Sequence, residues 1–144
     1  MRTYSLKPFL LLLITLFAIG TAPSVAQTIK GLAPADEYFG PLKMSVLGVQ
    51  NSLRDESARL DASSAGDPDS AFQHVTLVEA SVRDWAAKYP GDTWLPRTLL
   101  ALERLYAKIE SDRSRQHASE VASWLIDRYP ASPETTRLRA EFAR

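Results

Sequence analysis

Hydrophobic side chains recur at every third or fourth position along two neighbouring stretches of the chain. In the first stretch they occupy Ala71, Val75, Val78, Val82, Trp85 and Tyr89. In the second stretch they occupy Leu95, Leu99, Leu102, Tyr106 and Ile109. This spacing gathers them on one face of a helix with 3.6 residues per turn. The pattern therefore predicts two amphipathic helices, each of which must bury one face.

A tight turn is predicted between these two helices. Pro90 disfavours the helical conformation in the residue before it, and Gly91 can adopt the left-handed conformation that commonly ends a helix. Asp92 or Thr93 can accept hydrogen bonds from the next helix, and Pro96 lies in its first turn, where a missing N–H costs nothing. The whole segment is thus expected to be an antiparallel helical hairpin.

Further helices are predicted on both sides of this hairpin. Upstream, a hydrophobic stripe consists of Leu42, Val46, Val49, Leu53 and Leu60. Asp67 before Pro68 is typical of a helix start. Downstream, a stripe with a new phase consists of Ala118, Ala122, Leu125 and Tyr129. The change of phase places a turn near residues 110–114, with Ser111 or Asp112 as the N-terminal cap.

The chain also contains an internal repeat. A shift of 40 residues brings the Tyr-Pro pair at 89–90 onto the Tyr-Pro pair at 129–130 and superimposes the hydrophobic stripes that precede them. In both copies another proline opens the following helix. The last helix is expected to be capped by Ser132 and to turn Leu138 and Phe142 inward.

These patterns predict one all-α domain over residues 42–144, built from about five helices in antiparallel hairpins. Two of the hairpins are placed at about 70–109 and 113–143. The hairpins can stack in a short open array or close into a helical bundle, and the spacing alone permits both.

Two copies of helix, Tyr-Pro turn and helix resemble tetratricopeptide-like (TPR-like) repeats. The segment DRYPASPETTRLRAEFA in particular resembles the helical repeats of bacterial cell-envelope proteins. The resemblance covers about residues 70–144. It implies a short TPR-like array that acts as a non-catalytic, partner-binding scaffold of the envelope.

The N-terminus has the features of a signal peptide over residues 1–26. Two basic residues precede an apolar run at 9–19, which is shorter than the roughly 17 to 25 residues that span a bilayer. Small residues at Ser24 and Ala26 predict cleavage after Ala26 and a periplasmic or secreted product with no integral membrane span. Residues 27–41, which contain two Gly and two Pro, are expected to form an irregular lead-in.

Composition excludes several classes of function. The chain has 17 basic and 17 acidic side chains, a balance that does not favour nucleic acid as a partner. It contains no cysteine, which excludes disulfides, thiolate metal sites and the lipid-modified cysteine of a lipoprotein.

No residue pattern of a catalytic, metal or cofactor site is present. His74 and His117 lie far apart in sequence without metal-binding spacing and are expected at the surface or at helix caps. No serine lies in a nucleophile elbow, and the six glycines form no phosphate-binding loop. The sequence therefore predicts no catalytic residues, no metal and no cofactor, and an uncharacterised enzyme is the least favoured alternative.

Aromatic residues off the helical stripes are the candidates for partner contact. They are Trp124, Trp94, Tyr38 and Phe39. Tryptophan and tyrosine are frequent at interface hot spots, although these residues could instead extend the core over the loops. A protein–protein interaction scaffold is the favoured function. A small periplasmic helical chaperone or stress protein that binds unfolded clients is the alternative.

Overall fold

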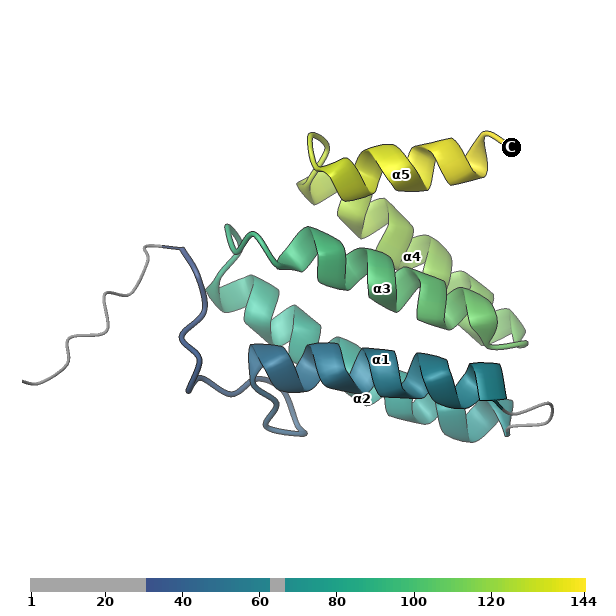
Figure 1. Cartoon of the computed structure of the whole chain (residues 1–144), viewed down its shortest axis with the longest axis horizontal. Coiled ribbons are helices and arrows are strands. Elements are labelled where there is room, and N and C mark those ends of the chain that lie inside the picture. The colour runs from purple at the N-terminus through teal and green to yellow at the C-terminus, as the bar shows by residue number, and fades with distance from the viewer. Residues whose placement is uncertain (1–30, 63–66) are drawn as a thin grey trace, which may run out of the picture.

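The computed structural model describes residues 31–62 and 67–144, and within these ranges all helices and strands longer than a single bridge are α-helices (Figure 1). Its five helices are α1 (Val46–Ala62), α2 (Pro68–Lys88), α3 (Leu95–Lys108), α4 (Asp112–Arg128) and α5 (Pro133–Phe142). The prediction of an all-α fold with about five helices is confirmed. The predicted signal peptide, residues 1–26, lies outside the described residues. None of the described helices combines the length and the hydrophobicity needed to cross a membrane.

The helices form two layers, with α1, α3 and α5 in front and α2 and α4 behind (Figure 1). The central helix is α3, which packs against all four others. The helix pairs in substantial contact are either consecutive in sequence or separated by a single helix. A closed bundle would also bring the first helices against the last ones. The packing is therefore that of an open, two-layered array of helices.

The predicted stripes of α2 and α3 form the core. Five of the six predicted positions of α2 are fully or almost fully buried, and so are all five positions of the second stripe. Leu138 of α5 is buried as expected. Phe142 is 64% exposed, because it lies in the last turn of α5, at the edge of the array.

The first helix begins four residues later than the hydrophobic stripe predicts. Leu42 is 41% exposed and belongs to a turn in which Phe39 and Met44 pair as an isolated antiparallel bridge. Gly40 has φ +64°, and a Cβ there would lie 2.4 Å from the hydroxyl of Ser81. Only glycine allows this close approach. The chain consequently reaches helical geometry only at Val46.

The N-caps of α2, α4 and α5 follow the local signals. Asp67, Ser111 and Ser132 each accept a hydrogen bond from a backbone N–H in the first turn of α2, α4 and α5. Asp92 accepts from the N–H of Trp94, which holds the N-cap position of α3. Of the two alternatives for α4, Ser111 is the residue used. The prediction that Asp92 or Thr93 caps α3 is wrong, because Trp94 holds the N-cap position and makes no side-chain capping hydrogen bond.

The described part of the lead-in is fastened to α2 and to the turn after it. Three long-range hydrogen bonds hold it: Ala33 N to Asp92 Oδ2 (2.9 Å), Gly40 N to Asp84 Oδ2 (2.9 Å) and Tyr89 Oη to Glu37 Oε2 (2.9 Å). The lead-in thus covers the end of the core at Trp85.

Candidate functional site

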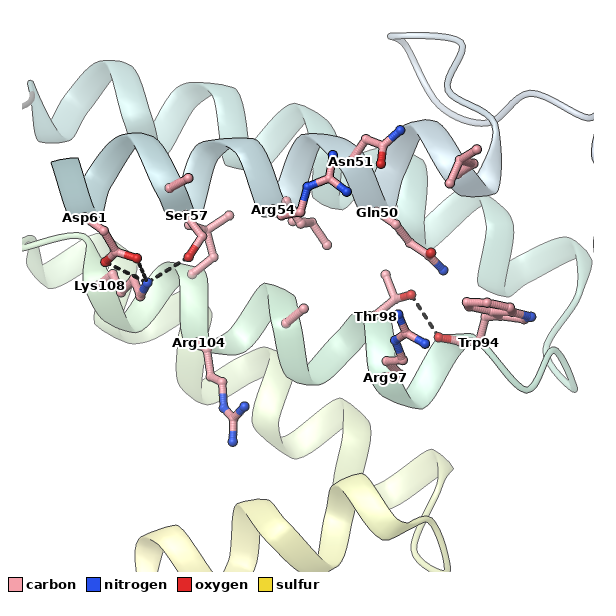
Figure 2. Close-up of a pocket in the computed structure, with 15 residues that line it drawn as sticks. Gln50, Asn51, Arg54, Ser57, Asp61, Trp94, Arg97, Thr98, Arg104 and Lys108 are labelled. Carbon is pink, nitrogen blue, oxygen red and sulfur yellow. Dashed lines mark hydrogen bonds and ion pairs between the residues drawn. The ribbon is translucent and has the colours of Figure 1, made fainter. Parts of the chain in front are cut away.

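An open groove with a volume of about 860 Å³ runs between α1 and α3 (Figure 2). Its polar and aromatic lining includes Gln50 and Arg54 of α1, and Trp94, Arg97, Arg104 and Lys108 of α3 or its N-cap. Because α1 lies beside α3 in the front layer, both helices contribute one long face to the groove (Figure 1).

The groove face of α3 follows the same three-and-four spacing as its core face. Residues 94, 97, 101, 104 and 108 line the groove, while the buried stripe of Leu95, Leu99 and Leu102 turns away from it. This second stripe, which carries three basic residues and a tryptophan, is readable in the sequence. The sequence does not mark this stripe as a site, because nothing local indicates that another helix stands opposite.

Basic side chains outnumber acidic ones in the groove. Four of its lining residues are Lys or Arg, and Asp61 is the single acid among them. Lys108 binds Asp61 (2.8 Å) and Ser57 Oγ (2.7 Å), which ties α3 to α1 at one end. Arg104 forms an ion pair with Glu141 of α5. These two cations are therefore already engaged within the protein.

The opposite end of the groove is less constrained. The guanidinium of Arg97 lies 5.0 Å from the ring centre of Trp94 and forms no ion pair with any described acid. Trp94 is 41% exposed, and Leu47, in the first turn of α1, is 64% exposed. The side chain of Gln50 is directed across the groove towards Thr98 and Trp94 (Figure 2). Its Nε2 is buried without a hydrogen-bond partner among the described residues.

Of the four aromatic candidates, the structure places only Trp94 in this groove. Phe39 is fully buried, stacked on Trp85 at 6.2 Å, and so belongs to the core, which the sequence left open as its alternative. It offers no surface to a partner. Tyr38 is 58% exposed but lies in the lead-in.

Trp124 lies in the rear layer, half-buried against the core. Its ring is covered by Arg83 at 4.9 Å, and it lines a smaller cavity of about 350 Å³ between α2 and α4. The four candidates therefore do not form one surface.

A polar cluster links α2, α3 and α4 away from the groove. The buried carboxylate of Glu79 accepts hydrogen bonds from Tyr106 Oη (2.6 Å) and Arg83 Nε (2.7 Å), and His117 Nδ1 lies 3.0 Å from it. Burial acts to raise the pKa of Glu79, but these three partners outweigh it and hold the pKa below its usual value. Burial, together with the hydrogen bond to Glu79, raises the pKa of Tyr106 far above its usual value.

This cluster has a structural role. Glu79 is only 4% exposed, so no substrate reaches its carboxylate. His117 is half-buried and packs beside Tyr106 with 5.1 Å between ring centres, so the expected surface or capping role is wrong. Its partner Glu79 lies 38 residues away in sequence, and no local pattern indicates the contact. Across residues 31–62 and 67–144, no cluster of His, Asp and Glu is arranged to hold a metal ion.

Comparison of the chain with models of known protein families, with curated proteins and with solved structures finds no match. The groove and its lining residues therefore carry the functional argument.

Proposed function

We propose that the protein is an exported, non-catalytic scaffold of the bacterial envelope that binds another protein in the groove between α1 and α3. The observation that carries this proposal is the groove itself, which combines an exposed tryptophan with several arginines. Tryptophan and arginine are the residue types most enriched at binding hot spots.

The length of the groove supports a polypeptide as its occupant. Its lining on α1 extends from Leu47 to Asp61, which corresponds to about 21 Å at 1.5 Å per residue. An extended peptide rises about 3.3 Å per residue, so the groove accommodates about six residues of a strand. A small molecule would occupy only part of such a long, open site.

A selective scaffold agrees better with the surface than a general chaperone does. In the part of the chain that the structure describes, the large exposed hydrophobic residues are Tyr38, Leu42, Leu47, Leu77, Trp94 and Phe142, which belong to different parts of the fold. Only Leu47 and Trp94 line the groove. Binding of varied unfolded clients would call for a continuous apolar patch, whereas hydrophobic residues scattered singly are normal for a protein surface. Export rests on the signal-peptide pattern of residues 1–26.

Site-specific photo-crosslinking in living cells tests this function. Two variants carry a photoreactive residue, one at Ala101 in the groove and one at Ser119 on the outer side of α4; both positions are exposed. We expect Ala101 to crosslink to one or a few envelope proteins, and Ser119 to give no such product. Crosslinks from Ala101 to many unrelated proteins would support the chaperone instead. The absence of any protein crosslink at Ala101 would refute both functions.

A further inference from the structure

We infer that the groove between α1 and α3 selects an acidic segment of its partner, with an apolar side chain next to the acids. This inference rests on the proposed function and specifies the chemistry of the partner. It follows from how charge is distributed over the molecule. The chain as a whole has equal numbers of basic and acidic residues, yet the groove is lined by four basic residues and one acidic residue.

The cations that can receive a ligand lie in the half of the groove that contains Trp94. Lys108 is held by Asp61 and Ser57, so the far end of the groove is satisfied within the protein. Arg97 is paired with no described acid. Among the described residues, Arg54 forms its ion pair with Asp55, its neighbour in sequence, and both side chains are about 70% exposed. Such exposed pairs exchange readily for a better partner.

Gln50 and Arg97 lie in the same half of the groove. The Nε2 of Gln50 is buried, so a ligand in the groove does not reach it. Gln50 projects from α1 towards Trp94 (Figure 2). A carboxylate that enters this half of the groove can accept hydrogen bonds from the guanidinium of Arg97.

The aromatic part of the site defines the second requirement. Trp94 and Leu47 are both exposed and lie at the same end of the groove, where the first turns of α1 and α3 face each other. The face of Trp94 that is not covered by Arg97 can pack against an apolar side chain. A suitable segment therefore carries one or more carboxylates beside a hydrophobic residue. Purely apolar segments would cover Arg97 without giving it a partner, at a desolvation cost.

Selection from a random peptide library tests the inference without assuming a partner sequence. Peptides of about 12 residues, long enough to exceed the groove, are displayed on phage and selected on the purified protein. We expect Asp and Glu to be enriched about twofold or more over the unselected library, next to an aromatic or aliphatic residue. Enrichment of apolar peptides without acids, enrichment of basic peptides, or no enrichment at all would overturn the inference.

Affinities of one selected peptide then locate the contact. We expect Arg97→Glu to raise its Kd about tenfold or more, and a change from about 50 to 200 mM NaCl to weaken binding of the wild type. Arg128→Glu is the matched control, because Arg128 is exposed on α4, is not paired with a described acid and does not line the groove. An equal loss of affinity in the two variants would also overturn the inference.

The two proposals can fail separately. If Ala101 crosslinks to a defined envelope protein while the selected peptides are not acidic, the scaffold stands and the acidic preference is wrong. If acidic peptides bind through Arg97 while no envelope protein crosslinks at Ala101, the preference stands and the scaffold is wrong.

Discussion

The carboxylate of Glu79 is predicted to be a polar group on which the stability of the fold depends strongly. It is almost completely buried and joins three helices through Tyr106, Arg83 and His117. The variant Glu79→Ala removes the acceptor of all these contacts at once. The consequences differ among the three partners, because they differ in their access to water.

The size of the stability loss expected for Glu79→Ala follows from those differences. Arg83 is about half exposed and recovers most of its lost interaction from solvent. Tyr106 is fully buried, and without Glu79 its hydroxyl retains only a long contact of 3.4 Å to Thr76. A buried group left unpaired costs about 1–3 kcal/mol, and breaking a buried charged network typically costs about 3–5 kcal/mol. We therefore expect Glu79→Ala to lower the free energy of unfolding by about 3–5 kcal/mol. Tyr106→Phe, which leaves the carboxylate two partners, should cost about 1.5–3 kcal/mol.

Urea unfolding followed by far-ultraviolet circular dichroism measures both values. The double variant Glu79→Ala/Tyr106→Phe should lose less stability than the sum of the single variants, because the second change removes the hydroxyl that the first leaves unpaired. Two outcomes would refute this reasoning: a loss below about 1 kcal/mol in Glu79→Ala, or strictly additive losses.

Three further predictions concern the core and its titrating groups. The pKa of Glu79 is lowered in the folded protein, so its contribution to stability should be lost as the pH falls below 4.5. The pKa of Tyr106 is raised, so its contribution should be lost as the pH rises above 10.0. Thermal unfolding measured across this pH range checks both limits. Burial and the nearby charge of Glu141 raise the pKa of Glu103. Glu103→Gln should therefore stabilise the protein by about 0.5–2 kcal/mol at neutral pH. A variant that melts below the wild type would contradict this prediction. Trp124→Ala removes a half-buried ring and should lower the free energy of unfolding, measured in urea, by about 1–3 kcal/mol. Trp85→Ala removes a fully buried ring and should lower it by about 3–5 kcal/mol. The reverse order would contradict the burial argument.

The helices and the core of this protein could be predicted from the sequence because their signals are local. The periodicity of α2 and α3 fixes which faces are buried, and Asp67, Ser111 and Ser132 cap helices within three residues of themselves. Such features depend on hydrogen bonds and spacing inside a single segment.

The groove could not be predicted in the same way, since it depends on which helices stand side by side. Its two walls are separated by the whole of α2, and their polar faces resemble any solvated helix surface until they are opposed. The start of α1 differs from the predicted position for a related reason. The turn before it is set by the contact of Gly40 with Ser81, about 40 residues away. Phe39 is buried by Trp85 and Tyr89 of the same distant region.

The central claim is that a protein partner binds in the groove at Trp94, and the affinity of the Trp94→Ala variant tests it most directly. The measurement is the Kd of the envelope protein that crosslinks at Ala101, together with the Tm of the variant. Because Trp94 is exposed and outside the core, the account predicts a Tm within a few degrees of wild type and a Kd raised about tenfold or more. An unchanged Kd in the correctly folded variant would contradict it.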